Sequence, residues 1–265
     1  MSRLEPDPSL IADLARADPD RWLAARLGPP ETRARLTALY AVNLELARVG
    51  ETTTEALIGA MRLAWWRETV QAIGAGEPPR AHPAALALAA ALDDLGDERE
   101  AVAEALLALI DARERDIDPE PFASPQAVCA YAEATAGAVM GLAGRLSVTP
   151  QLTAAQAQAL ALGGRAWGLA GLARSVGPLA ARGWRPWPAA WLDARARDQL
   201  AHRDSETARR VACELAAASE RAWRDARPAL RALPADFAPV IGYLALLPAY
   251  GRAVRAPTYN PFAAP

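Results

Sequence analysis

The chain has 265 residues, a formal net charge of -2 at pH 7 and a hydrophobic fraction of 52%. This length and apolar content suffice for one large core, and the nearly balanced charge gives no indication of a nucleic-acid partner. Every basic side chain other than two histidines is an arginine. The absence of lysine excludes a Walker-type phosphate loop and a Schiff-base lysine.

The first twenty residues are rich in Asp and Glu and contain no apolar core. This composition fits neither a transit peptide nor a secretory signal. Along the rest of the chain, no uninterrupted apolar stretch reaches the roughly 18–20 residues that a transmembrane helix needs. The sequence therefore predicts a cytoplasmic protein, for which membrane contact would be peripheral, at the inner membrane.

Apolar residues recur with the period of an α-helix along the chain, and no alternating pattern indicates a strand. Proline is expected to bend or break the last two predicted helices, at Pro228 and Pro239. The tail, residues 257–265, is predicted to be irregular. The predicted helices cover residues 31–51, 52–73, 83–94, 98–115, 124–146, 153–176, 188–200, 204–233 and 235–254.

The sequence has no internal repeat and no long linker, so residues 1–265 are predicted to form one domain, with a core over about 30–255. The stretch 177–188 is rich in Gly, Pro and Trp and is interpreted as a loop between helices. Its tryptophans, with Trp191, would pack on the helical body or form a lid or an amphipathic contact surface. Cys129 and Cys213 lie far apart and indicate free thiols in a reducing compartment.

Two segments carry the main functional signal. Residues 40–51 read Tyr-Ala-Val-Asn-Leu-Glu-Leu-Ala-Arg-Val-Gly-Glu, and residues 172–188 run from Leu-Ala-Arg-Ser-Val-Gly-Pro-Leu to Trp-Arg-Pro-Trp-Pro. Both resemble the signature segments of the squalene/phytoene synthase family, which joins prenyl diphosphates head to head. The resemblance extends to residues 58–67, 131–140, 163–174 and 226–255. It implies an all-α, single-domain helical bundle of the isoprenoid-synthase type around a central cavity.

The acidic clusters of that family are missing from both segments. In the active members the first segment carries an Asp-Asp-x-x-Asp-like cluster and the second reads like Arg-Asp-x-x-Glu-Asp, and these carboxylates bind Mg²⁺. Magnesium prefers hard oxygen ligands, so their loss implies an absent metal site and no catalytic residues to name. No cofactor is expected, with Mg²⁺ required only if the chain is an enzyme. The corresponding positions here are Ala47, Arg48, Glu51, Ser175, Pro178 and Leu179.

One branch of the family also lacks these aspartates and resembles assembly factors for respiratory complex I. Residues 42–49, Val-Asn-Leu-Glu-Leu-Ala-Arg-Val, are similar to the first segment of that branch, and residues 58–66 and 131–133 fit it too. The resemblance implies a non-catalytic assembly or accessory protein whose partners are proteins, among them subunits of a respiratory complex.

Two alternatives stay open. The chain could be an active head-to-head prenyltransferase that retains Glu51, Tyr131 and Arg174 and builds its metal site differently. It could also be a metal-free binder of an isoprenoid, a prenyl diphosphate or a quinone, because arginine suits phosphate without metal. The arginines would instead be neutralised if nearby glutamates pair with them. Candidate ligand-binding residues at the cavity mouth are Tyr40, Asn43, Arg48, Glu51, Tyr131, Glu133, Arg174, Arg182 and Arg185.

Other features favour structural roles. The literal Asp-Asp-x-x-Asp string at residues 93–97 ends a helix and indicates a solvated turn. The charges of residues 111–118, which include Arg113 and Asp116, indicate surface ion pairs. Small residues could hold the cavity open, or Met, Leu and Trp167 could fill it, and the sequence does not decide between the two. The small residues in question are Ala47, Gly137, Gly141 and Gly168.

Overall fold

The computed structural model describes residues 6–52, 55–117, 120–149, 151–185 and 187–263, with the backbone alone at residues 51, 52 and 201. Within these ranges the chain is helical, and the β-structure consists of one isolated bridge between Phe122 and Pro188. The α-helices are α1 (Pro8–Ala17), α2 (Pro19–Ala25), α3 (Pro30–Thr52), α4 (Ala56–Gly74), α5 (Pro83–Leu92), α6 (Glu98–Arg113), α7 (Pro125–Ala132), α8 (Ala138–Ser147), α9 (Ala154–Arg174), α10 (Val176–Ala181), α11 (Ala194–Ala201), α12 (Ser205–Arg231), α13 (Ala238–Ile241) and α14 (Leu247–Arg255).

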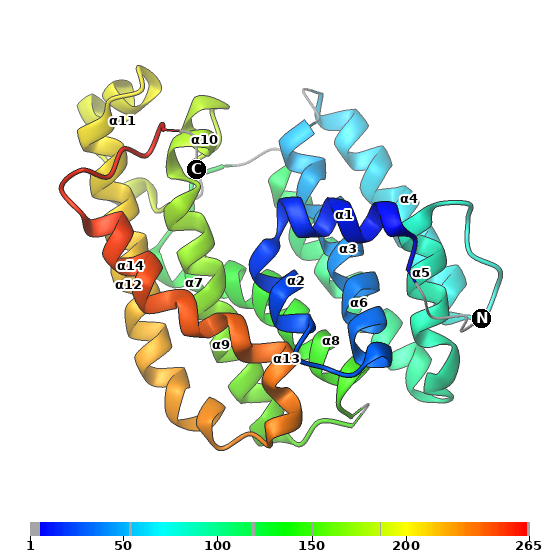
Figure 1. The fold of residues 1–265 in the computed structure, drawn as a ribbon. Helices are drawn as coiled ribbons and strands as arrows, with labels where there is room; N and C mark the ends of the chain where they lie inside the picture. Colours follow the sequence, from blue (N-terminus) through cyan, green and yellow to red (C-terminus); the bar gives the residue numbers. More distant parts are fainter. Residues whose placement is uncertain (1–5, 53–54, 118–119, 150, 186, 264–265) are drawn as a thin grey trace.

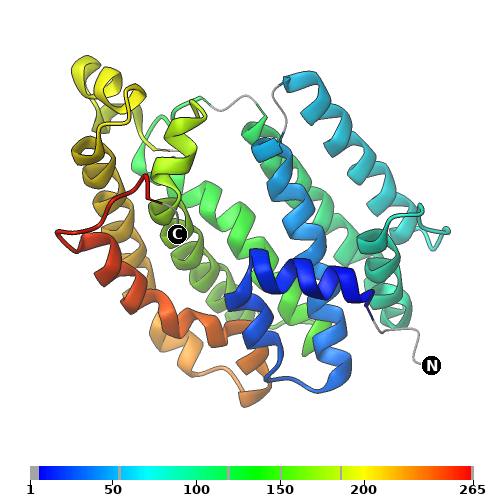
Figure 2. The ribbon, with the colours of Figure 1, turned by 45° about the horizontal axis from the view of Figure 1, so that its top comes forward.

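The helices pack around two adjoining apolar clusters. The larger one is built mainly from α3 to α6, α8 and the first part of α9. The smaller one joins α7, the end of α9, α10, α11 and the first half of α12. Helix α9 contributes to both and packs along α12. Figures 1 and 2 show the two groups of helices side by side, with α1 and α2 lying across one face of α3.

Two helices, α1 and α2, precede residue 31, where the first predicted helix begins. Asp7 caps α1 by accepting a hydrogen bond from the backbone N–H of Ser9 at 2.7 Å, and Asp18 caps α2 in the same way. Proline follows each cap, where its fixed backbone angle suits the first turn of a helix. Leu14 and Ala24 are buried in the larger cluster, so α1 and α2 belong to the folded core.

Most predicted helices lie close to their expected positions, including those capped by Ser124 and Thr153. Helix α12 continues through Pro228 to its end. Pro228 is exposed, so water can replace the backbone hydrogen bond that it removes. The predicted helix over 235–254 is broken: α13, a 3₁₀ segment η6 (Gly242–Leu246) and α14 follow one another.

The predicted loop over 177–188 contains a short helix and packs on the body. Helix α10 runs through it, and Trp187 is buried in the smaller cluster. The backbone N–H of Phe122 donates to the carbonyl group of Trp187 at 3.1 Å. The tail lies on α10, because a Cβ atom at Gly177 would stand 1.9 Å from the carbonyl oxygen of Pro261. These contacts place the tryptophan-rich stretch and the irregular tail against the helical body.

Two glycines permit an unusually close approach between α9 and the π-helical turn η3 (Glu133–Gly137) that joins α7 to α8. A Cβ atom at Gly164 would stand 2.4 Å from the Cα atom of Gly137 and 2.6 Å from the carbonyl oxygen of Ala136. At Gly168, a Cβ atom would stand 3.0 Å from the Cβ atom of Ala132. The small residues Gly137 and Gly168 therefore serve helix packing at these points.

We predict that Gly164→Ala lowers the free energy of unfolding by about 1–3 kcal/mol, because the added methyl group meets backbone that cannot rotate away. Gly171→Ala on the same helix is the matched control. A Cβ atom there has no neighbour within 4 Å among the described residues, so this change is expected to stabilise by about 0.5–1 kcal/mol. Denaturant unfolding of both variants measures the difference. Equal stability of the two would contradict the close packing.

Two helical segments are long and apolar enough to cross a membrane by length and composition, Pro125–Ser147 and Ala235–Arg255. The first is 61% buried inside the fold, as expected for a core helix. The second is only 39% buried. The sequence had indicated no segment of this kind, because neither span is an uninterrupted apolar stretch: Glu133 and Arg145 interrupt the first, and Asp236 and Arg252 the second.

Candidate functional site

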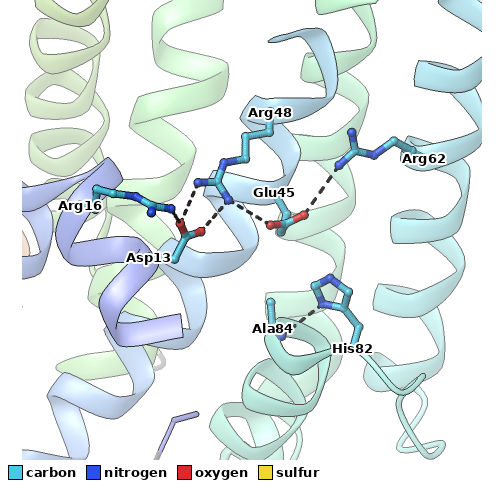
Figure 3. A network of polar contacts seen from close by, with 7 residues as sticks. All are labelled: Asp13, Arg16, Glu45, Arg48, Arg62, His82 and Ala84. Atoms are coloured by element: carbon cyan, nitrogen blue, oxygen red, sulfur yellow. Dashed lines mark hydrogen bonds and ion pairs between the residues drawn. The ribbon is translucent and has the colours of Figure 1, made fainter. Parts of the chain in front are cut away.

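The place expected for the first acidic cluster lies on α3 and is occupied by an ion-pair chain. The guanidinium group of Arg48 donates to both carboxylate oxygens of Asp13 on α1, at 2.6 and 3.1 Å, and lies 3.5 Å from Glu45. Arg16 contacts Asp13 at 2.5 Å, and Arg62 on α4 lies 3.8 Å from Glu45. Figure 3 shows the charges alternating along this chain, which ties α1 and α4 to α3.

Asp13 and Glu45, the two carboxylates of this ion-pair network, both pair with arginine. The hydrogen bond from Arg48 lowers the pKa of the Asp13 carboxyl group below its ordinary value, so Asp13 stays ionised at neutral pH. Of the other two positions expected to bind metal, Ala47 offers no ligand. The side chain of Glu51 lies outside the described residues. The described part of the cluster is therefore a structural cross-link and not a metal site.

The place expected for the second acidic cluster lies where α9 ends and α10 begins. Ser175 is the residue between the two helices, and Pro178 is exposed on α10. Leu179 is buried in the smaller apolar cluster. A side chain in that setting packs against hydrocarbon, and a carboxylate there would lose its hydration without a partner. One of the three positions of the second cluster, Leu179, is thus part of the core.

An ion pair from α2 enters the interior of the bundle. Arg21 is buried and donates to the carboxylate of Asp18 at 2.6 Å. Its guanidinium carbon lies 5.4–5.9 Å from the ring centres of Tyr40, Trp167 and Tyr243. Such contacts are cation–π interactions, which strengthen when the cation is removed from water. One turn of α2 therefore inserts a cation among aromatic rings from α3, α9 and η6.

A second buried ion pair follows at the end of α6. Arg113 donates to Asp116 at 3.2 Å and to the amide oxygen of Asn43 at 3.4 Å. The hydroxyl group of Tyr131 donates to the other carboxylate oxygen of Asp116 at 2.7 Å. Asp116 is buried, and this burial raises the pKa of its carboxyl group, although Arg113 and Tyr131 act in the opposite direction. The sequence had indicated surface ion pairs over residues 111–118, which is wrong for Arg113 and Asp116, whereas Asp111 and Glu114 are exposed and pair with Arg67.

Several interior polar atoms have no hydrogen-bond partner among the described residues. They include the hydroxyl groups of Tyr40 and Tyr243 and the Nε atoms of Arg21 and Arg113. Burial raises the pKa of both tyrosines, so they stay protonated. Groups of this kind usually find water. Together with the two ion pairs they give the interior a polar character.

The remaining candidate residues do not converge on this interior. Glu133 pairs with Arg165, whose Nε atom donates to it at 2.8 Å. Arg174 is exposed, lies 4.0 Å above the ring of Tyr250 and stands 3.9 Å from Asp20. Arg182 follows α10 and is exposed, and Arg185 is half-buried next to the tryptophans.

Thus Tyr40, Asn43 and Tyr131 lie inside the bundle, whereas Arg48 and Arg174 face elements that cover it. The acidic string at residues 93–97 is also accounted for, since Asp93 and Asp94 are exposed and pair with Arg99 and Arg35. Sequence reasoning missed Asp18 and Arg21. The cap signal Asp18-Pro19, which starts a helix, could have revealed their position.

The donor set does not fit a divalent metal. Among the described residues, no group of three or more His, Cys, Asp and Glu side chains could hold an ion. Asp18 and Asp116 each have an arginine partner, Arg21 and Arg113, whose Nε atoms are also buried. Magnesium catalysis of diphosphate release needs several free carboxylates. The carboxylates described in the interior are therefore each paired with an arginine.

A match to a known family model identifies the family of this fold. The squalene/phytoene synthase family model matches residues 14–264. The chain belongs to the squalene/phytoene synthase family. The match begins within α1, which agrees with the inclusion of the N-terminal helices in the fold.

The curated relatives are named as assembly factors and not as synthases. The chain is 32% identical over 129 residues to NADH dehydrogenase (ubiquinone) complex I, assembly factor 6, of Mus musculus and 31% identical to the protein of that name from Homo sapiens. Each alignment covers 49% of this chain and only 37% of the relative. The likeness is therefore to part of those proteins.

A solved structure supports the fold assignment across the whole chain. A dehydrosqualene synthase, crystallised in complex with a ligand, superposes with a TM-score of 0.75 and covers 96% of this chain and 88% of its own. The sequence identity is 16%, so this similarity concerns the fold. The family and the all-helical fold predicted from the two signature segments are both confirmed.

Proposed function

We propose that this chain is a catalytically inactive member of the squalene/phytoene synthase family that acts through protein contacts in the assembly of a respiratory NADH dehydrogenase. One observation carries the loss of activity: the positions of the two acidic clusters hold an arginine bound to Asp13 and a leucine in the core. Neither residue can bind Mg²⁺, and the proposed role needs no cofactor.

The choice of partner rests on the curated relatives, which are named as assembly factors of complex I. Their similarity covers half of this chain, so the proposed partner is a subunit or an assembly intermediate of that type of complex. We place the protein in the cytoplasm, with peripheral contact at the inner membrane where such a complex is assembled.

The first test of this proposal measures pyrophosphate release from farnesyl and geranylgeranyl diphosphate in excess Mg²⁺. An active dehydrosqualene synthase serves as the positive control. We expect no release above background from this chain. Clear release would support the prenyltransferase alternative, and substitution of Glu51 and Asp93 would then locate the carboxylates responsible.

The second test deletes the gene in its host. We expect a loss of assembled NADH dehydrogenase, seen as lower NADH:quinone activity of isolated membranes and as a missing band in native gels. Succinate:quinone activity is the internal control and should not change. Expression of the unaltered chain should restore the complex. Unchanged NADH dehydrogenase after deletion would refute the assembly role, whatever the outcome of the turnover assay.

Thermal unfolding distinguishes a metal-free isoprenoid carrier from the assembly factor and from the prenyltransferase. A rise in melting temperature with farnesyl diphosphate or a quinone in the absence of Mg²⁺ would indicate a bound isoprenoid. The arginines of the interior are the observation that keeps this reading open, because their guanidinium groups suit a phosphate.

A further inference from the structure

One face of the molecule exposes large apolar side chains from segments far apart in sequence. Leu23 and Leu27 lie one turn apart at the end of α2 and are 56% and 66% exposed. Leu246 in η6 is 38% exposed. A Cβ atom at Gly242 would stand 3.1 Å from Leu27, so the end of α2 adjoins η6. In Figure 1, α2 and α13 lie next to each other on the near face.

An apolar groove continues this face. It has a volume of about 560 Å³ and lies between the end of α12 and the segment from Pro234 to Pro248. Trp223 and Ile241 line its apolar part. Its charged residues are Arg227 and Arg231, and none of the described residues that line it is acidic. The two arginines are four residues apart on one helix, so both guanidinium groups stand on the same side of the groove.

The groove extends along α14. A smaller pocket of about 120 Å³ shares Trp223 and Pro248 with it and is bordered by Arg252 and Arg255. Its acidic residue, Glu220, lies 2.5 Å from Arg255 and is thereby neutralised. The described residues that line the two pockets are mostly apolar, and four of their five charged residues are arginines.

We propose that this face, formed by Leu23, Leu27, Arg227, Arg231, Ile241 and Leu246 and here termed the lipid-facing surface, docks the protein on an anionic phospholipid membrane. The inference deepens the peripheral membrane location proposed above and rests on it. Exposed leucines enter the boundary between headgroups and acyl chains, while arginines bind lipid phosphates. The segment Ala235–Arg255 would lie in the interface, because its 3₁₀ break and its packing on α2 and α9 hold it in the fold.

Charge favours a lipid surface over a second copy of the chain. A symmetric dimer through this face would bring the same surface patch of both copies together. Arg227 and Arg231 would then face other arginines without an acidic residue from the described groove to pair with. Lipid phosphates supply the negative charge that the groove lacks.

The test is sedimentation of the full chain with vesicles of phosphatidylcholine alone or of phosphatidylcholine with phosphatidylglycerol. We expect binding to the anionic vesicles that weakens as salt is raised. The double variant Arg227→Gln/Arg231→Gln should lower the partition coefficient on the order of 30-fold, since each arginine near an anionic surface contributes a several-fold factor. Leu23→Ser/Leu27→Ser should lower it by roughly tenfold or more.

Matched controls change the same chemistry elsewhere. Leu57→Ser/Met61→Ser alters α4 side chains that are 71% and 64% exposed, and Arg195→Gln/Arg210→Gln removes two exposed arginines from α11 and from the start of α12. Both should bind as the unaltered chain does, and all four variants should keep its melting temperature.

The inference is overturned if the chain sediments with neither vesicle, or if the control variants lose binding as much as the test variants. It is also overturned if the unaltered chain is a dimer that Leu23→Ser/Leu27→Ser dissociates without any change in vesicle binding. These results are independent of the assembly role, because deletion of the gene measures NADH dehydrogenase and vesicle sedimentation measures lipid binding. Either can fail while the other succeeds.

Discussion

Arg21→Ala is expected to lower the free energy of unfolding by about 3 kcal/mol. The change removes a cation that is enclosed by the rings of Tyr40, Trp167 and Tyr243, and it leaves the carboxylate of Asp18 without its partner. Loss of one partner of a fully buried ion pair costs about 3–5 kcal/mol, and Asp18 keeps some contact with water, which reduces that cost. Denaturant unfolding measures the change directly.

The matched control is Arg26→Ala, one turn later in the chain. Arg26 is exposed and lies 5.0 Å above the ring of Trp22, so its loss should change stability by no more than about 0.5 kcal/mol. The double variant Asp18→Asn/Arg21→Met should recover part of the loss, because asparagine can still cap α2 and no charge is left unpaired. If Arg21→Ala lowered the free energy of unfolding as little as Arg26→Ala does, the guanidinium group of Arg21 would not be buried as described.

Arg21 also determines what α1 and α2 do for the molecule. These helices are fixed from two sides, by the ion pair of Asp13 with Arg48 and by the packing of Arg21 against the rings of Tyr40, Trp167 and Tyr243. The two contacts place an N-terminal cover over the end of α3, where an active family member would need free carboxylates.

The sequence predicted the fold well because helix periodicity and cap residues are local. Ser124 and Thr153 begin α7 and α9 as their residue types require. The same signal was present at Asp7-Pro8 and Asp18-Pro19, but the acidic N-terminus was considered only as a targeting segment. The family resemblance supplied the topology, which no local pattern contains.

The site was harder to predict because burial depends on partners remote in sequence. Arg113 and Asp116 are three residues apart and look like a surface pair, yet Asn43 and Tyr131 enclose them. Tyr40, Asn43 and Tyr131, predicted to lie at the cavity mouth, are buried in the bundle, and their role as ligand-binding residues stays a prediction. Arg182, predicted at the cavity mouth, is exposed in the turn after α10, and its role stays a prediction.

Asp116→Ala is expected to be at least as damaging as the loss of Arg21. It leaves Arg113 as an uncompensated buried cation and removes the acceptor of the Tyr131 hydroxyl group. We expect the free energy of unfolding at pH 7 to fall by about 3–5 kcal/mol. Asp111→Ala, on the preceding helix α6, is the control, because Asp111 is exposed and its contact with Arg67 should contribute less than about 1 kcal/mol.

The pH dependence gives an independent check on the burial of Asp116. Its folded-state pKa is raised above the ordinary value of 3.8, so the folded protein binds this proton more tightly than the unfolded chain does. The contribution of this group therefore stabilises the fold most below pH 3.8 and is lost as the pH rises through the raised folded-state pKa. Asp116→Asn cannot titrate and should remove this component from the pH profile of stability, whereas Asp111→Asn should retain it. Identical profiles for Asp116→Asn and the unaltered chain would show that the carboxyl group is not buried, and with it would fall the case for a closed, arginine-bearing interior.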